Sequence, residues 1–238
     1  MGRFRRSKSP RAAVLAPVLE SKLTAPGVRP GHVARQRLVS RLSGFVPQKL
    51  TVLAAPAGFG KTTLLAEWFE NEPRGSVAWV TLDEHDDDPL RFWSHVVEAL
   101  RRIAPDVNAA LRKGALGETL DSDELVPRLL NVLARVQRPI SLVLDDYHVI
   151  ASERIHESLS QLVHHIPPHV CVVVATRRDP PLPLGRLRAA GDLGELRASD
   201  LRFDLAEARA LLTESLGLEL GDEDVEYLHV KAEGWPAA

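Results

Sequence analysis

Short apolar runs alternate with amphipathic runs along most of the chain. Five apolar runs have the length and composition of buried strands. They cover residues 50–55, 76–82, 140–145, 170–176 and, with a weaker pattern, 193–197. Strands that are apolar on both faces and alternate with helices are typical of a parallel sheet covered by helices on both sides. The pattern therefore predicts an α/β fold.

The amphipathic runs predict helices between these strands. They cover residues 62–70, 89–103, 123–136 and 153–166. The acids between residues 83 and 88 precede the second of these helices, and we interpret them as capping residues in preference to a metal site. Residues 114–119 predict a loop. The prolines after Asp179 end the fourth strand, because proline has no N–H to donate to a sheet ladder.

After residue 203 the strand pattern disappears and a helical pattern begins. Asp204 and Glu207 fit a capping box that begins a helix running through Leu216. A second helix is predicted over residues 222–233 and ends at Gly234, and Pro236 is typical of a new helix start. We therefore expect the sequence to be the front part of a longer protein. The expected regions are a basic flexible tail at 1–18, a sheet domain at 19–202 and the beginning of a truncated helical domain at 203–238.

Composition and charge exclude several classes of protein. The 238 residues are enough for a core that needs no disulfides, and the single cysteine, Cys171, excludes a disulfide framework and a cysteine-based metal centre. A formal net charge of −2 argues against binding nucleic acid over the whole surface. The longest apolar runs are too short to cross a bilayer. We expect a cytoplasmic protein with no membrane partner.

The first eleven residues are strongly basic. Their cations are Arg3, Arg5, Arg6, Lys8 and Arg11. The short apolar stretch that follows lacks the cleavage site of a secretory signal. We interpret this region as a solvated basic tail, with a phosphate-binding arm as the alternative.

The strongest chemical motif is APAGFGKTT at residues 55–63, which follows a predicted strand and begins a helix. Gly58 and Gly60 let the backbone turn so that consecutive N–H groups face one anion, and the helix dipole adds positive potential. This arrangement is a P-loop. The usual pattern has glycine where Ala55 stands, and alanine is tolerated there if its φ is negative. The alternative is a glycine-rich turn with a surface lysine.

The P-loop predicts where a nucleotide's phosphates bind. The expected phosphate-binding residues are Ala57, Gly58, Phe59, Gly60, Lys61, Thr62 and Thr63. The Lys61 ammonium is expected to reach the β- and γ-phosphates, and the Thr62 hydroxyl is expected to bind Mg²⁺.

Charged residues follow two other predicted strands. Asp145 and Asp146 end the third strand, at the edge of the sheet where parallel α/β folds bind ligands. We expect Asp145 to hold Mg²⁺ and Asp146 to orient or deprotonate an attacking water. Arg177 follows the fourth strand and is expected to sense the γ-phosphate. The alternatives are ordinary turn acids and an exposed arginine.

Several histidines between residues 148 and 169 invite comparison with metal ligands. Pro167 and Pro168 interrupt any helix between His165 and His169, so the i,i+4 ligand geometry is lost. We expect these histidines not to bind a metal.

With these motifs in order, the chain resembles the ATPase domain of the MalT-like large ATP-binding LuxR regulators. These proteins belong to the STAND class of P-loop signal-transduction NTPases. The resemblance runs from about Leu19 to the last residue. The matching segments are PGHVARQRL, APAGFGKTTL, VAWVTLD, LVLDDYHVI, ATRRDPPLPLGRLRA, DLRF and EGWP.

The resemblance implies an AAA-like three-layer sandwich at 19–202 that binds ATP or ADP against a helical lid. It implies that Val33 and Arg35 hold the adenine and ribose side, that Pro236 contacts the base from the lid, and that Arg177 is the sensor. It further implies slow Mg²⁺-dependent hydrolysis, with self-association in the ATP state. DNA binding in such proteins belongs to regions that this sequence does not contain.

Two other functions remain open from the sequence. A P-loop small-molecule kinase needs a basic lid over the phosphates, for which Arg186 and Arg188 are the candidates. A degenerate scaffold binds nucleotide without hydrolysing it, or has lost binding because part of the lid is missing.

Overall fold

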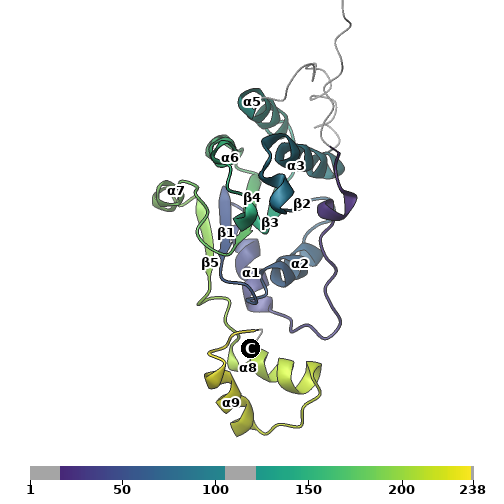
Figure 1. Ribbon diagram of the computed structural model, residues 1–238, viewed down its shortest axis with the longest axis vertical. Helices are drawn as coiled ribbons and strands as arrows, with labels where there is room; N and C mark the ends of the chain where they lie inside the picture. The colour runs from purple at the N-terminus through teal and green to yellow at the C-terminus, as the bar shows by residue number, and fades with distance from the viewer. Residues whose placement is uncertain (1–16, 105–121, 237–238) are drawn as a thin grey trace, which may run out of the picture.

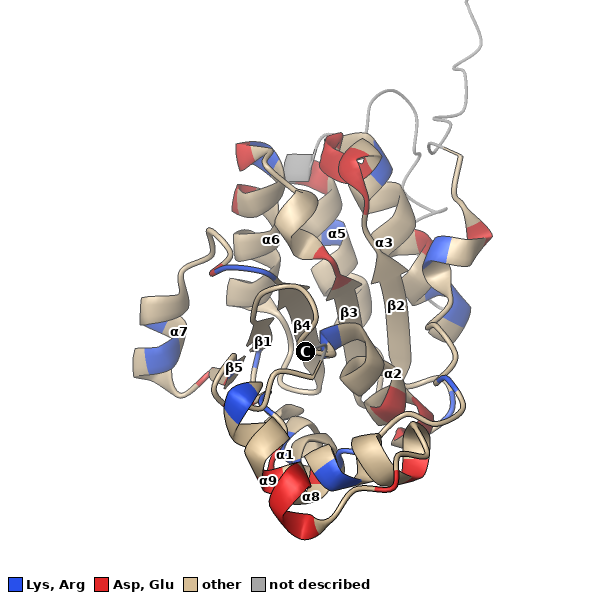
Figure 2. Ribbon diagram, turned by 60° about the horizontal axis from the view of Figure 1, so that its bottom comes forward, with Lys and Arg blue, Asp and Glu red and all other residues tan. Residues whose placement is uncertain are grey.

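The computed structural model of the chain describes residues 17–104 and 122–236. In Figure 1 a sheet lies between two layers of helices, and a smaller helical unit near the C-terminus lies beyond one of these layers; Figure 2 shows the same arrangement turned by 60°. The tail predicted at residues 1–16 and the loop predicted at 114–119 lie outside the described residues.

The sheet has five parallel strands in the order β2-β3-β4-β1-β5. They are β1 (Leu50–Ala54), β2 (Val77–Thr81), β3 (Ile140–Asp145), β4 (Val170–Thr176) and β5 (Leu193–Arg197). All five predicted strands are confirmed to within one residue at each end, and the α/β fold class is confirmed. Because β4 lies between β1 and β3, the loops after all three strands meet at one edge of the sheet.

Helices cover both faces of the sheet (Figure 1). α1 (Gln36–Phe45) and α2 (Lys61–Asn71) cover one face, and α3 (Pro89–Ile103), α5 (Ser122–Leu133) and α6 (Glu153–His165) cover the other, with α7 (Leu184–Ala190) beside β5. Successive strand side chains point to opposite faces. In β1, Leu53 accordingly packs under α1 and α2, while Val52 packs on the opposite side.

The four helices predicted between the strands are confirmed, with ends that differ by at most three residues, but the sequence did not predict α1 or α7. α1 lacks a side-chain N-cap, because its first position follows Arg35, so the usual start signal is missing. α3 carries that signal: Pro89 is its first residue, and Asp88 accepts a hydrogen bond from the Arg91 N–H at 2.9 Å. The capping interpretation of the acids before α3 is therefore confirmed.

One of these acids has a second role. Asp86 is fully buried beneath the short helix η1 (Glu20–Leu23), where it binds Lys22 and lies 2.9 Å from Nδ1 of His95. Burial alone opposes ionisation, but the bonds from His95 and Lys22 outweigh it and hold the pKa of Asp86 well below its usual range. These contacts fix the N-terminal segment to α3.

We call the small helical unit, residues 203–236, the lid. Its first helix is α8 (Leu205–Arg209), which follows the predicted Asp204–Glu207 capping box. The prediction of one continuous helix through Leu216 is wrong, because a π-helical segment, η4 (Ala210–Ser215), follows α8. There the Leu216 N–H bonds to the carbonyl of Leu211, five residues back. The Thr213 hydroxyl donates a hydrogen bond to the carbonyl of Arg209, four residues back. Threonine side chains that bond to the backbone in this way often bend or destabilise a helix.

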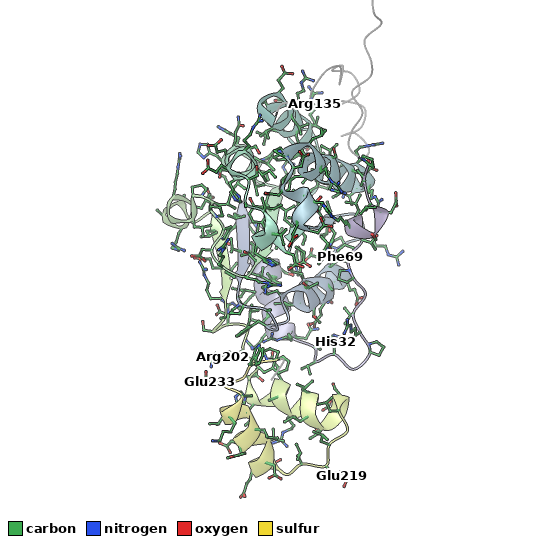
Figure 3. All side chains as sticks on the ribbon, in the orientation of Figure 1. His32, Phe69, Arg135, Arg202, Glu219 and Glu233 are labelled. Carbon is green, nitrogen blue, oxygen red and sulfur yellow. The ribbon has the colours of Figure 1, made fainter. Side chains whose placement is uncertain are left out.

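After α9 (Asp222–Lys231), the chain contacts the first residues of the lid again. Gly234 has a positive φ of 68°, and its carbonyl accepts a hydrogen bond from the Phe203 N–H at 2.7 Å. A Cβ at this position would lie 2.7 Å from the Phe203 oxygen, so only glycine fits. Arg202 binds Glu233 beside this contact, as Figure 3 shows at the neck between the two units.

No helix in the described part of the chain combines the length and the apolar character that crossing a membrane requires.

Candidate functional site

A cavity of about 770 Å³ lies at the edge of the sheet where β1, β3 and β4 end. The segment at residues 26–33 forms one wall. The P-loop and the first turns of α2 form the floor, together with Asp146 and Arg177. Phe203, Leu211 and Pro236 complete the cavity from the lid side. This edge is where parallel α/β folds bind their ligands.

The P-loop adopts the backbone shape that the sequence predicts. Gly58 and Gly60 have positive φ values of 83° and 73°, in the left-handed region that glycine enters without steric cost. Ala55 is not among the described non-glycine residues with positive φ, so alanine is compatible with this position. α2 begins at Lys61, which places its N-terminal end against the cavity.

Lys61 is 8% exposed and lies on the floor of the cavity. Its Nζ donates hydrogen bonds to the carbonyls of Ala55 at 2.7 Å and Pro56 at 2.9 Å. An ammonium has three donors, so one remains for an acceptor in the cavity. Burial lowers the pKa of Lys61, and the nearby carboxylates of Asp146 and Asp145 oppose this effect.

Thr62 and Asp145 form a hydrogen-bonded pair at the N-terminal end of α2. The Thr62 hydroxyl lies 3.1 Å and 2.9 Å from the two carboxylate oxygens of Asp145, to which it donates. Asp145 is only 1% exposed, and burial together with the charge of Asp146 raises its pKa to about 6. Hard oxygen donors of this kind suit Mg²⁺, and a cation beside Asp145 would favour its ionised form.

Asp146 takes a backbone conformation that is unusual for a residue other than glycine. Its φ is 58°, in the left-handed region that aspartate and asparagine tolerate better than most residues. Its N–H donates to Asp145 at 3.0 Å, and its side chain is half-buried at the cavity wall. This turn separates the two neighbouring acids: Asp145 faces Thr62, and Asp146 faces the cavity.

His148 lies beside Asp146 without lining the cavity itself, and the sequence did not predict it near the site. Its Nδ1 is buried, lies 3.7 Å from a carboxylate oxygen of Asp146 and has no hydrogen-bond partner among residues 17–104 and 122–236. Burial and the charge of Arg177 lower the pKa of His148, which favours the neutral imidazole. The available signal was its position two residues after Asp146, in the turn that follows β3.

Arg177 lies at the end of β4 with its side chain on the cavity wall. It is exposed, and its guanidinium has no hydrogen-bonding partner among the described residues. Its charge acts on the pKa values of Lys61 and His148, which places it in the same electrostatic environment as these two residues.

Arg35 connects the cavity wall to the lid. Its side chain is 5% exposed and donates to the carbonyls of Leu201 at 2.9 Å and Arg202 at 3.0 Å. It also lies over the ring of Phe203, 4.9 Å from its centroid. The guanidinium therefore contacts the start of the lid as well as the cavity.

The cavity brings together most of the residues expected from the sequence. Those that line it are Val33, Arg35, Ala57, Gly58, Gly60, Lys61, Thr62, Thr63, Asp146, Arg177 and Pro236. Asp145 and Phe59 are not among the lining residues: Asp145 lies behind Thr62, and Phe59 packs against the core under α1 and α2. The sequence did not predict residues 26–32, Ala66, Phe203 or Leu211 as lining residues.

The fold and the cavity together define a P-loop NTPase domain with a helical lid. The chain belongs to the AAA ATPase domain family, whose model matches residues 11–173. This match confirms the P-loop NTPase domain that the sequence predicted.

The chain is similar to a protein kinase and to a transcriptional regulator. Serine/threonine-protein kinase PknK of Mycobacterium tuberculosis is 35% identical over 219 residues, which are 90% of this chain and 20% of the kinase. The HTH-type transcriptional regulator MalT of Vibrio campbellii is 31% identical over 221 residues, 92% of this chain and 24% of the regulator. The chain thus spans about a fifth to a quarter of the length of these relatives.

Two solved structures share the fold. A STAND protein with a tetratricopeptide repeat sensor from Pyrococcus horikoshii has a TM-score of 0.59 and 16% identity, covering 93% of this chain and 30% of that one. A Walker-type ATPase of Pyrococcus abyssi has a TM-score of 0.53 and 15% identity, covering 89% of this chain and 67% of that one.

Proposed function

We propose that this module is an ATP-operated switch of a MalT-like transcriptional regulator, with slow Mg²⁺-dependent hydrolysis. One observation supports this above the others: a single cavity is lined by the P-loop, by the ends of β3 and β4, and by the lid. A nucleotide in this cavity contacts both units at once. Its phosphate state can therefore influence how the lid lies on the sheet domain.

The phosphate end has a defined set of binding groups. The backbone N–H groups of the P-loop and the start of α2 provide donors and a favourable dipole for an anion. The positively charged ammonium of Lys61 lies on the floor of the same cavity and has one donor left for a phosphate oxygen. Thr62 and Asp145 would hold Mg²⁺, which neutralises phosphate charge when bound.

The hydrolytic step depends on the groups at the ends of β3 and β4. Asp146 would orient the attacking water and accept its proton, since its side chain lies at the cavity wall. Arg177 would bind the γ-phosphate oxygens, which only the triphosphate carries. Two carboxylates in adjacent positions and one cation are a small catalytic set, consistent with a switch that turns over slowly.

The similar proteins favour regulation over metabolism. The same region of about 220 residues matches a protein kinase and a transcriptional regulator. Because these two proteins differ in activity, a control module that both use explains the shared segment better than a common metabolic reaction does. Under this proposal the protein acts in the cytoplasm and self-associates in its ATP state. DNA binding would reside outside these 238 residues.

The small-molecule kinase alternative has less support. Arg186 and Arg188, its candidates for a basic lid, lie on α7 and do not line the cavity, and Arg188 binds Glu195. No second candidate function is therefore retained. The degenerate scaffold, which lacks hydrolysis, remains an outcome of the following test.

The test is calorimetric titration of the chain with ATP and ADP in the presence of Mg²⁺. We expect both to bind, and we expect Lys61→Ala to weaken binding roughly tenfold to hundredfold, because a charged hydrogen bond to phosphate is lost. Lys231→Ala on the outer helix α9 is the matched control and should bind normally. Phosphate release above the Lys61→Ala background separates the switch from the scaffold. Phosphoryl transfer to a metabolite would contradict the proposal.

A further inference from the structure

One ionic cluster, in which Arg35 and Glu207 are buried and Arg37 is exposed, joins the lid to the sheet domain. We call Arg35, Arg37 and Glu207 the junction cluster. Glu207, on α8, is 7% exposed. Arg37 donates to its two carboxylate oxygens at 3.0 Å and 2.9 Å, and Arg35 lies 3.3 Å from one of them. A single carboxylate of the lid thus binds two arginines at the start of α1.

The same arginines bind the segment that leads into the lid. Arg35 donates to the carbonyls of Leu201 and Arg202, and Arg37 donates to the carbonyl of Arg202 at 2.8 Å. Glu207 itself accepts the Asp204 N–H at 3.1 Å, which completes the cap of α8. Moving the lid away would break all of these hydrogen bonds and ion pairs together. The junction cluster therefore holds the lid where it closes the cavity.

The junction cluster is also connected to the helix that carries the P-loop lysine. The backbone N–H of Arg35 donates to both carboxylate oxygens of Glu67, at 3.0 Å and 3.1 Å. Glu67 is buried on α2, the helix that begins at Lys61. A continuous series of bonds thus runs from α2 through Arg35 to Glu207 on the lid.

Arg35 is the member of the junction cluster that faces the cavity. It lines the cavity together with Phe203, over which its guanidinium lies. Its Nη1 is buried and has no hydrogen-bond partner in the described part of the chain. A ligand on this side of the cavity would therefore contact the Arg35 guanidinium, which is the group that binds Glu207. Glu207 does not line the cavity.

We propose that Glu207 is a positioning residue that couples lid closure to the nucleotide through Arg35, without touching the nucleotide itself. This rests on the proposed function, because it assumes that the cavity binds a nucleotide. When Glu207 is bound to both arginines, the side of the cavity that the lid forms stays in place. This side includes Leu211 and Pro236. Without the charge of Glu207, the lid loosens and the base side of the site is lost, while the phosphate side remains.

The experiment compares Glu207→Gln with Glu214→Gln, a change of an exposed carboxylate on the same lid. Calorimetry measures the affinity of each full chain for Mg-ADP and for Mg-pyrophosphate, which lacks the base and ribose. Hydrogen–deuterium exchange of residues 200–236 reports how firmly the lid is held. Near-ultraviolet circular dichroism confirms that the core is folded.

We expect Glu207→Gln to weaken ADP binding by about tenfold or more, because one side of a buried charge pair is removed. Pyrophosphate affinity should stay within about twofold of the unchanged chain. In Glu207→Gln, hydrogen–deuterium exchange of residues 200–236 should be faster, both with and without ADP. Glu214→Gln should behave as the unchanged chain. A residue that merely supports the fold would lower both affinities together.

Arg37→Gln provides a second variant in case Glu207→Gln does not fold. It removes the more exposed of the two arginines and keeps the Arg35–Glu207 pair, so we expect a smaller loss of ADP affinity in the same direction. Unchanged ADP affinity or unchanged lid exchange in both variants overturns the coupling alone. If the unchanged chain binds neither ADP nor pyrophosphate, the proposed function fails and the coupling fails with it.

Discussion

The hydroxyl of Thr62 bonds to both carboxylate oxygens of Asp145, so the first turn of α2 is connected to the end of β3. α2 follows β1 through the P-loop, and β1 and β3 are not neighbours in the sheet, since β4 lies between them. The contact therefore crosses the sheet edge under the cavity. It places a hydroxyl and a carboxylate where one Mg²⁺ could bind both.

Thr62→Val should remove the Mg²⁺ dependence of nucleotide binding. The valine methyl cannot bind the cation, and it leaves the buried Asp145 carboxylate without the hydroxyl donor, so that only the Asp146 N–H remains. We expect the ratio of ATP affinities measured with and without Mg²⁺ to fall towards one. Thr62→Ser keeps the hydroxyl and should retain the ratio. Full Mg²⁺ dependence in the valine variant would show that Thr62 is not a ligand.

Asp145→Asn should stabilise the nucleotide-free chain at neutral pH. The pKa of Asp145 is raised from its usual 3.8 to about 6, so the folded state retains a proton that the unfolded chain loses. The stability that this proton contributes is fully present below about pH 4 and is lost as the pH rises through about 6.

The size of this effect follows from the pKa difference. A tenfold difference in proton affinity is worth about 1.4 kcal/mol, so at pH 7.5 the asparagine variant should gain up to about 3 kcal/mol. At pH 4 it should gain little. Urea unfolding at the two pH values measures the difference, and Asp192→Asn, which changes a half-exposed carboxylate, is the control. Equal gains at both pH values would contradict the raised pKa.

Asp146→Asn should separate hydrolysis from binding. Asparagine tolerates the left-handed backbone at this position, but it cannot accept a proton from water. We expect phosphate release to fall by roughly a hundredfold or more, with ATP affinity nearly unchanged. Asp146→Ala should lose turnover as well, and it should also lose about 1–2 kcal/mol of stability to backbone strain. Normal turnover in the asparagine variant would exclude Asp146 as the base.

Gly194→Ala should destabilise the sheet at β5. A Cβ there would lie 2.6 Å from Cγ of Phe45 and 2.5 Å from Oε1 of Gln48, so α1 would have to move away from the strand. Overpacking of this kind costs about 1–3 kcal/mol. Gly185→Ala in α7 meets no atom within 4 Å and should gain roughly 0.5–1 kcal/mol. Chemical denaturation of the two variants should therefore give shifts of opposite sign.

The sequence alone was sufficient for the strands and for the phosphate side of the site. Buried strands have a short apolar pattern that is visible locally, and the P-loop is encoded within nine consecutive residues. Asp145, Asp146 and Arg177 could be assigned to one edge because each directly follows a parallel strand. Their detailed roles in the structure, such as the burial of Asp145 behind Thr62, depend on packing.

The tertiary structure alone decided how the cavity is closed and how the lid is held. Arg35 and Glu207 are 172 residues apart in the chain, and neither carries a local pattern that indicates the other as its partner. The same is true of Phe203 and Leu211, which reach the cavity only because the lid folds back across the sheet edge. Local periodicity reports which face of an element is buried. It does not report which distant element covers that face, because that choice depends on the free energy of the whole packed arrangement.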